Sequence, residues 1–200
     1  MDVERPVYNV YMKTSEPSLE SLPPRERILL AAHALFYGEG IRATGVDKII
    51  ERSAVSKVTF YRQYASKDDL IRAYLDYRHE KWISWFRTSL AQATASGSSA
   101  VDALTTTLMG WFSQPDFRGC AFLNAAAELG SSDPEILATV RRHKHEMASV
   151  LDELFGGDAI SAGRSLSLVI DGAIVHAQMG HPIHDVMEDF QAVVSRNLHK

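Results

Sequence analysis

Between residues 57 and 63 the sequence gathers side chains that can bind another molecule by hydrogen bonds or apolar contacts: Lys57, Val58, Thr59, Tyr61, Arg62 and Gln63. Cations suit phosphate oxygens, hydroxyl and amide groups suit base edges, and the methyl groups of Val58 can contact the methyl group of thymine. Phe60 and Tyr64 are four residues apart and would form the inward side of a helix. Contact with nucleic acid is one interpretation of this mixture. The other is that the tyrosines are packing residues and Arg62 is a solvated charge.

A helix-turn-helix would present these side chains. Thr44 is expected to cap a first short helix, and a break at residues 53–56 separates that helix from a second one that runs through Tyr64. Two short helices joined by a tight turn, the second rich in groups that reach bases and phosphates, are the usual form of this motif.

Further helices are expected on both sides of the motif. Before it, the two prolines at 23 and 24 suit a first helical turn, and the glycines at 38–40 end that helix. After it, Ser66 and Asp69 have the spacing of a capping box. We therefore expect a long helix from Lys67 to about residue 93.

This stretch closely resembles the DNA-binding domain of the tetracycline-repressor (TetR) family from about residue 25 to 74. The shared motifs are Val55-Ser56-Lys57, Thr59-Phe60-Tyr61, an aromatic residue at 64 and Ser66-Lys67-Asp68-Asp69-Leu70. The resemblance implies contacts to bases or nearby phosphates for Lys57, Val58, Thr59 and Tyr61. It implies phosphate-facing positions for Thr44, Arg62, Gln63 and Lys67. It also implies a homodimer that binds a palindromic DNA operator and represses transcription until a small-molecule effector binds.

Two residues depart from the family's pattern. Ala54 stands in the turn where the family often has glycine, and Val58 stands where it often has glycine or another small residue. Ala54 restricts the geometry of the turn, since a Cβ atom disfavours left-handed backbone. Because of Val58, the operator sequence of this protein cannot be inferred from the operators of relatives.

The charge of the chain is unevenly distributed. Its 200 residues carry 21 basic and 25 acidic side chains, a net charge of -4. Residues 25–87 hold 12 Lys and Arg against 8 Asp and Glu, or +4, which leaves 9 against 17, or -8, for the rest. Such a split indicates a basic module for a polyanion joined to an acidic body, although many such biases are only solvated faces.

Composition places the chain among ordinary globular proteins. Hydrophobic residues make up 46% and charged residues 23%, which excludes collagen-like and wholly disordered classes. The single cysteine, Cys120, excludes an internal disulfide, and no segment has the pattern of a signal peptide or a membrane span. We expect a cytoplasmic protein with no membrane partner.

The remaining segments also have helical patterns, so the expected fold class is all-α. Helices are expected over residues 101–112, 119–130, 135–155, 161–179 and 184–198. The expected domains are a flexible arm (1–22), a helix-turn-helix DNA-binding domain (23–70), and a ligand-binding and dimerisation domain (71–200).

Aromatic and methionine residues of the second domain, with a few polar groups, are the candidates for an effector site. They are Trp82, Trp85, Phe86, Met109, Phe112, Cys120, Asn124, His143 and Met147. Small-molecule sites combine apolar walls with a few converging polar groups. The same stripes are more often plain core, which is the alternative for each residue.

Residues 161–179 are apolar on more than one face, which favours a dimer interface formed by this helix and the last one. The candidates are Leu166, Val169, Ile170, Ala173 and Ala177. The alternative is burial of the same residues within one chain.

Other chemistry has little support. The eight histidines do not form a metal-ligand set with cysteine or glutamate, so neither a metal nor a cofactor is expected. No nucleophile, phosphate loop or carboxylate pair can be assembled from spacing, so no catalytic residue is proposed. The competing hypothesis is a helical small-molecule binding protein or enzyme without specific DNA binding, which sequence-specific, salt-dependent DNA binding would exclude.

Overall fold

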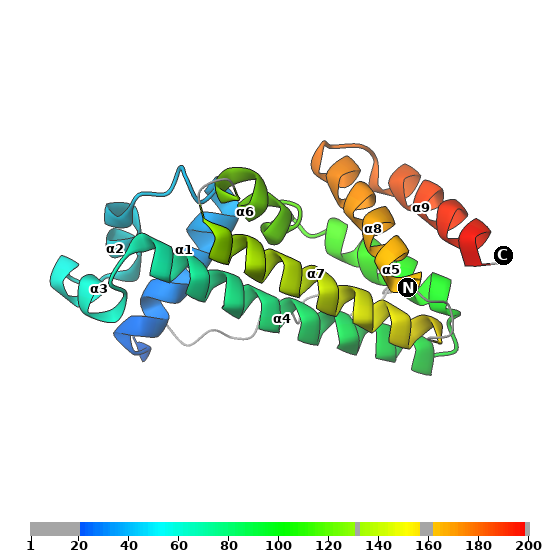
Figure 1. The fold of residues 1–200 in the computed structure, drawn as a ribbon, viewed down its shortest axis with the longest axis horizontal. Coiled ribbons are helices and arrows are strands. Elements are labelled where there is room, and N and C mark those ends of the chain that lie inside the picture. Colours follow the sequence, from blue (N-terminus) through cyan, green and yellow to red (C-terminus); the bar gives the residue numbers. More distant parts are fainter. Residues whose placement is uncertain (1–20, 131–132, 157–161, 199–200) are drawn as a thin grey trace, which may run out of the picture. The chain divides into compact units, whose positions relative to one another are not determined.

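The computed structural model describes residues 21–130, 133–156 and 162–198, and these contain helices and no strand (Figure 1). The all-α prediction is confirmed for this part of the chain. The helices are α1 (Pro24–Glu39), α2 (Val46–Ser53), α3 (Lys57–Gln63), α4 (Lys67–Ala95), α5 (Ala100–Phe112), α6 (Ala121–Leu129), α7 (Pro134–Phe155), α8 (Ala162–Gln178) and α9 (Ile183–Leu198). The expected arm lies outside the described residues except at 21 and 22.

Local sequence accounts for most of these boundaries. Prolines occupy the start of α1, and Gly40, with a φ of 96°, ends it. Ser66 begins α4, because its Oγ accepts a hydrogen bond from the Asp69 amide at 3.0 Å and donates one to the Asp69 carboxylate at 2.9 Å. The N-cap expected at Ser66 is therefore present, and the Asp69 carboxylate bonds to the Ser66 hydroxyl.

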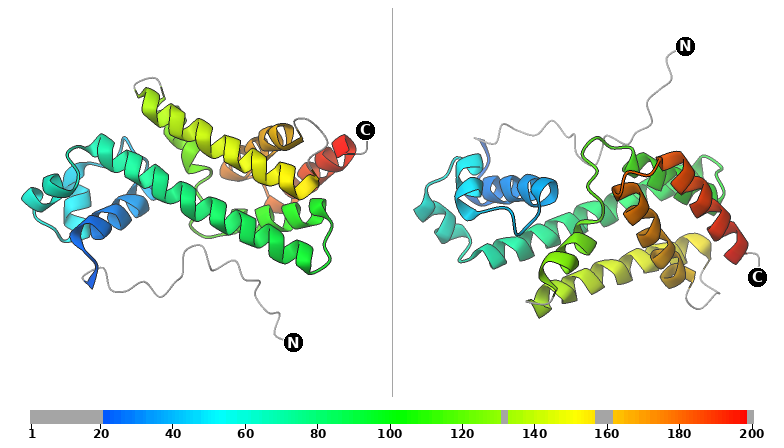
Figure 2. Two further views of the ribbon diagram at one scale, coloured as in Figure 1. Left: turned by 60° about the horizontal axis from the view of Figure 1, so that its bottom comes forward. Right: turned by 90° about the horizontal axis from the view of Figure 1, so that it is seen from above.

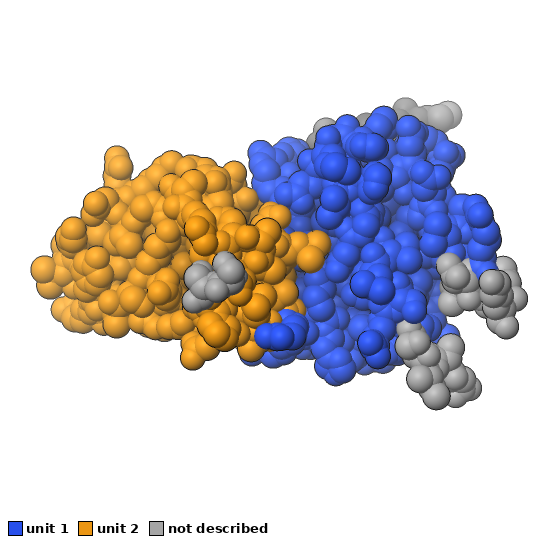
Figure 3. Space-filling model, turned by 45° about the horizontal axis from the view of Figure 1, so that its top comes forward, with its two compact units in different colours: residues 1–8, 82–120, 141–200 blue, residues 9–81, 121–140 orange. Residues whose placement is uncertain are grey.

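Contacts divide the chain into two compact units (Figure 3). Among the described residues, the N-terminal unit holds 21–81 and the 121–140 segment, and the C-terminal unit holds 82–120 and 141–198. The expected domain boundary after residue 70 thus falls inside the N-terminal unit. That unit also takes in α6 and the start of α7, which the sequence assigned to the second domain.

The N-terminal unit packs α1, α2, α3 and the first part of α4 together (Figure 2). Its core includes a buried cation. Arg78 is only 2% exposed, and its guanidinium lies 3.8 Å from the centre of the Tyr37 ring. Its Nη1 lies 3.1 Å from Nε2 of His33. Burial, and then the charge of Arg78, lower the pKa of His33 to about 3, so His33 is neutral near pH 7.

The C-terminal unit packs α9 against both α5 and α8. Helix α8 also meets α7 closely at Gly163, where the amide donates a hydrogen bond to Oδ1 of Asp152 at 2.7 Å. A side chain at this glycine would collide with the backbone carbonyl of Ala148. Within the described part of the chain, no helix combines the length and the apolar character that a membrane crossing requires.

Candidate nucleic-acid interface

The turn between α2 and α3 depends on a left-handed residue. Ala54 has φ 50° and ψ 43°, and among the described residues it is the only non-glycine with a positive φ. Ser56 then caps α3, because its Oγ accepts a hydrogen bond from the Thr59 amide at 3.1 Å. The Thr59 hydroxyl lies 2.9 Å from the same oxygen, so Thr59 is partly engaged in the cap.

The inward side of α3 is fixed by aromatic packing. Phe60 is fully buried and Tyr64 is 3% exposed, which confirms their expected direction. The Arg25 guanidinium lies 4.4 Å from the centre of the Tyr64 ring and donates a hydrogen bond to the Gln63 carbonyl at 2.6 Å. These contacts attach the C-terminal end of α3 to the start of α1.

The outward side of α3 exposes four of the eight side chains that the sequence assigned to DNA. Lys57, Val58, Tyr61 and Arg62 are exposed, whereas Thr59 and Gln63 are half-buried. Val58 is 78% and Tyr61 46% exposed. The Tyr61 ring meets the buried Phe60 ring edge-on at 5.2 Å, which restricts its motion. The Lys57 ammonium lies 3.5 Å from Asp47, an exposed pair that leaves the cation accessible.

Thr44 does not face outward, which corrects two expectations. Its side chain is fully buried, and its hydroxyl donates a hydrogen bond to the Gly40 carbonyl at 2.8 Å. The N-cap position of α2 is Gly45, without a side-chain cap. Thr44 therefore holds the loop between α1 and α2 together and cannot be counted among the exposed phosphate-facing groups.

Lys67 also serves the loop between α1 and α2. Its ammonium donates a hydrogen bond to the Ile41 carbonyl at 2.6 Å, and burial lowers its pKa despite the nearby carboxylates of Glu128 and Asp68. An ammonium has three donors, so this bond leaves others for a phosphate. A phosphate contact from Lys67 stays a prediction.

Glu128 of α6 clamps the same loop from another side. Its carboxylate accepts hydrogen bonds from the backbone amides of Ile41, at 3.2 Å, and Arg42, at 2.7 Å. The Arg42 side chain returns a hydrogen bond to the Glu128 carbonyl at 2.5 Å. Nothing in the spacing of the sequence connects α6 to residues 41 and 42, so the sequence did not predict this contact.

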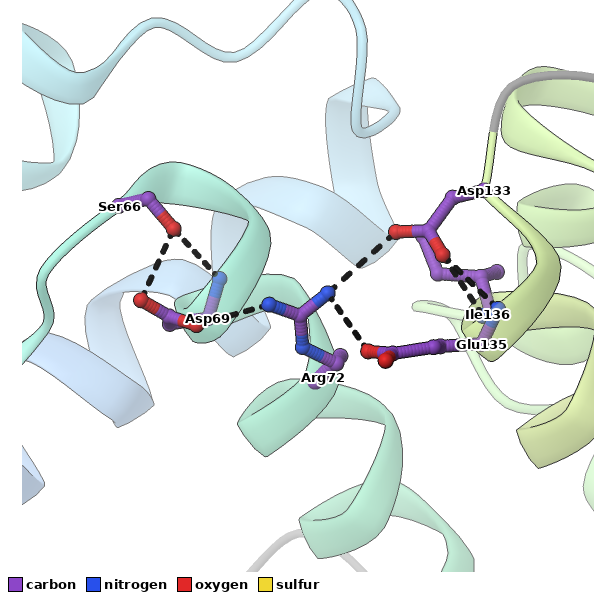
Figure 4. A network of polar contacts seen from close by, with 6 residues as sticks. All are labelled: Ser66, Asp69, Arg72, Asp133, Glu135 and Ile136. Atoms are coloured by element: carbon purple, nitrogen blue, oxygen red, sulfur yellow. Dashed lines mark hydrogen bonds and ion pairs between the residues drawn. The ribbon is translucent and has the colours of Figure 1, made fainter.

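An ionic network orders the first turns of α4 (Figure 4). Arg72 bonds to Asp69 at 2.8 Å and to Asp133 at 3.5 Å, and it pairs with Glu135 at 3.1 Å. Hydrogen bonds from Arg72 and then from Ser66 lower the pKa of Asp69. Asp133 in turn caps α7 by accepting from the Glu135 amide at 2.9 Å. The helix that carries Lys67 is thus attached to α7 within the N-terminal unit.

Known proteins share this architecture and part of the sequence. Residues 28–74 match the model of the family described as bacterial regulatory proteins, tetR family. The chain is 34% identical to SCO4454, a TetR-family transcriptional regulator from Streptomyces coelicolor, with a TM-score of 0.74, over 88% of this chain and 94% of that one. The chain belongs to the TetR family.

Two further relatives of this chain have named roles. The transcriptional activator FasR of Mycolicibacterium smegmatis is 34% identical over 70 residues, 35% of this chain and only about a third (32%) of FasR. The transcriptional repressor ComR of Escherichia coli is 22% identical over 82% of this chain and 84% of ComR. This TetR-family chain is a DNA-binding transcriptional regulator.

The residues expected at an effector site of this TetR-family protein fall in two places. Asn124 is half-buried in the N-terminal unit, and the other eight lie in the C-terminal unit. Of those eight, Trp85 and Met109 are half-buried, and the rest are buried: Trp82, Phe86, Phe112, Cys120, His143 and Met147.

Trp82 is the centre of an aromatic cluster in the C-terminal unit. Its ring stacks on Phe86 at 4.6 Å and meets Trp111 and His143 edge-on at 5.5 and 5.2 Å. Among the residues that the structure describes, neither the buried indole Nε1 of Trp82 nor the buried hydroxyl of Thr105 has a hydrogen-bond partner. Such orphaned groups call for an explanation, because leaving a buried donor unpaired costs about 1 to 3 kcal/mol.

The residues expected at a dimer interface are mostly covered by the chain itself. Leu166, Ile170 and Ala173 are 4%, 0% and 8% exposed, so their assignment to an open face is corrected. Val169 and Ala177 are half-buried. The exposed apolar surface here called the α8 face is formed instead by Leu168, Gly172 and Val175 of α8 and by Met179, the residue that follows α8.

Proposed function

We propose that this regulator binds a palindromic operator as a homodimer through α3, and that a small molecule bound in the C-terminal unit changes this binding. The observation that carries the DNA contact is the outward side of α3. This side carries two exposed cations, Lys57 and Arg62, and two exposed apolar side chains, Val58 and Tyr61. The helix is capped by Ser56 and packs its opposite side into the core through Phe60. Such a helix fits the major groove, where cations meet phosphates and apolar groups meet bases.

The α8 face supports the homodimer. Leu168, Val175 and Met179 are 75%, 43% and 59% exposed, and their spacing of seven and four residues places them on one side of the helix. Gly172 lies between them with open space where a side chain would be. A second copy of this chain is the occupant that we propose, because a two-fold interface uses the same patch twice and a palindromic operator requires two recognition helices.

The orphaned indole of Trp82 supports an effector site in the aromatic cluster. An aromatic or other apolar molecule with a hydrogen-bond acceptor would satisfy Nε1 while it contacts the surrounding rings. Such a ligand should quench or shift tryptophan fluorescence and raise the melting temperature by mass action. Trp82→Phe keeps an aromatic ring and removes the donor, so it should weaken a ligand that uses this donor.

Repression relieved by the effector is the regulatory outcome that we propose. ComR, which aligns over most of its length, is named a repressor, whereas FasR, named an activator, matches over about a third of its length. A reporter gene placed behind the operator should be silent with the protein and active when the effector is added. Higher expression with the protein present than without it would overturn repression.

Selection from random DNA duplexes, repeated with a panel of metabolites, tests DNA and effector together. We expect one palindromic sequence to be enriched, with an affinity that falls steeply with salt. Failure to enrich any sequence would favour the alternative of a binding protein or enzyme that does not recognise DNA.

A further inference from the structure

Val58 is the most exposed large apolar side chain in the described part of the protein, at 78%. A single exposed apolar residue needs no explanation by itself. Val58, however, is the second residue of α3, and the N-terminal residues of a recognition helix are those that reach base edges. Tyr61, three residues later, shares its side of the helix and is also exposed.

Folding gives no reason for a valine at this position. With most of its surface in water, its methyl groups add little to the core, and a β-branched residue is a weaker helix former than alanine. The stable parts of α3 lie elsewhere, in the Ser56 cap and the buried Phe60. The side chain of Val58 is therefore available for a partner.

The major groove offers one apolar group to such a side chain. Guanine, adenine and cytosine present hydrogen-bonding atoms there, whereas thymine also presents its C5 methyl group. Cytosine, the other pyrimidine, carries only a hydrogen at C5 and gives the valine no methyl group to pack on. Valine therefore favours thymine by apolar attraction.

We propose that Val58 selects a thymine in each operator half-site by packing on its C5 methyl group. This assignment rests on the proposed function, because it needs α3 to lie in the major groove. Lys57 and Arg62 on the same surface supply charge, which raises affinity for every duplex and leaves the choice of this base to Val58.

The test replaces single thymines of the selected operator by deoxyuridine, which removes only the methyl group. Binding of each duplex is measured by fluorescence anisotropy at one fixed salt concentration. At one position, deoxyuridine should weaken the wild-type protein about fourfold, the factor expected from one methylene-sized group. Changing both half-sites should give about fifteenfold, because distant sites are additive.

Two variants identify the residue that senses the methyl group. Val58→Ala should bind the thymine operator more weakly and lose the penalty for deoxyuridine. Lys57→Ala, the matched control, should bind all duplexes more weakly and keep that penalty. Both side chains are exposed, so thermal unfolding of the two variants should follow that of the wild type.

Three results are possible once both variants are shown to be folded. A deoxyuridine penalty that disappears only in Val58→Ala supports the assignment. A selected operator in which no deoxyuridine weakens the wild type, or a penalty that persists in Val58→Ala, overturns it and leaves the proposed function intact. Absence of any selected operator overturns both, and is recognised before a modified duplex is made.

Discussion

The N-terminal and C-terminal units differ in where they place polar groups and in what surrounds their exposed apolar residues. The N-terminal unit fixes its short helices with internal polar contacts from Thr44, Arg78 and Glu128, and it exposes Val58 and Tyr61 beside cations. The C-terminal unit has an aromatic interior with an orphaned indole, and it exposes the α8 face around a glycine. Exposed apolar residues alone therefore do not identify a partner; their neighbours do.

Introducing a glutamate into each of the two exposed surfaces, the α8 face and the outward side of α3, should give the largest effects and separate the roles of these surfaces. Leu168→Glu should produce a monomer and weaken operator binding about a hundredfold or more, because avidity from two half-sites is lost. Sedimentation velocity and anisotropy measure the two effects. Thr88→Glu, an exposed change on α4, is the charge-matched control and should leave both unchanged. A Leu168→Glu protein that remains dimeric would move the interface away from the α8 face.

Val58→Glu should give the reciprocal result. A carboxylate on the outward side of α3 would repel phosphates and remove the apolar contact, so operator binding should be lost while the protein stays dimeric. If this variant became monomeric, the contrast between the two surfaces would be wrong. Sedimentation velocity of the two glutamate variants, run side by side, measures this.

Removing the internal clamp of the N-terminal unit should have an intermediate effect. Glu128→Ala leaves the amides of Ile41 and Arg42 without their carboxylate and should lower the free energy of unfolding by about 2 kcal/mol. Urea denaturation measures the loss. Glu80→Ala, an exposed carboxylate on α4, should change stability by less than about 0.5 kcal/mol. Equal effects of the two changes would mean that the clamp is not part of what fixes this unit.

Acid should weaken the N-terminal unit through His33. Its pKa is lowered from 6.5 to about 3 in the folded protein, so below pH 6.5 the unfolded chain binds a proton that the folded chain does not. This contribution to stability is complete above pH 6.5 and is lost as the pH falls toward 3. Between pH 7 and pH 5 the loss should be about 1 to 2 kcal/mol.

His33→Gln tests the assignment, because glutamine offers an acceptor to Arg78 but does not titrate. Urea denaturation at pH 7 and at pH 5 should show a smaller loss for this variant than for the wild type, and other titrating groups cancel in the comparison. The same loss in both proteins would assign the acid sensitivity to another residue.

The smallest effect is expected in the turn of the helix-turn-helix. Ala54→Gly should raise the free energy of unfolding by about 0.5 to 1 kcal/mol, because relief of left-handed strain exceeds the entropy that glycine adds to the unfolded chain. Ala34→Gly, at an exposed interior position of α1, should instead lower it by about 1 kcal/mol. A loss of stability at both positions would contradict the strain at Ala54.

Sequence predicted the helices well because their ends depend on local chemistry. Prolines begin α1 and α7, Gly40 ends α1, and Ser66 with Asp69 begins α4. The direction of Phe60 and Tyr64 also followed from spacing along one helix. These features need no knowledge of distant residues.

Contacts between segments that are far apart in the sequence could not be predicted from such local patterns. A threonine before a helix looks like a cap, but the hydroxyl of Thr44 is satisfied by the Gly40 carbonyl in a loop whose path the sequence does not specify. The clamp from Glu128 joins segments 86 residues apart. In α8 the excess of apolar residues was visible from the sequence, but the sequence does not show which of them the chain covers itself, so the exposed Val175 was missed.

The two glycines of α8 have different surroundings: Gly163 packs against α7 of the same chain, and Gly172 lies on the face that we propose contacts a second copy. Gly163 accepts no side chain, because the Ala148 carbonyl occupies the space, whereas no other segment of the described chain lies within 4 Å of a Cβ placed on Gly172. If the α8 face joins two copies, its residues can be exchanged for complementary bulky and charged pairs while the contact at Gly163 stays untouched. Two such orthogonal variants would form only the mixed dimer, and each α3 could then be given a different half-site, so that an asymmetric operator becomes the target.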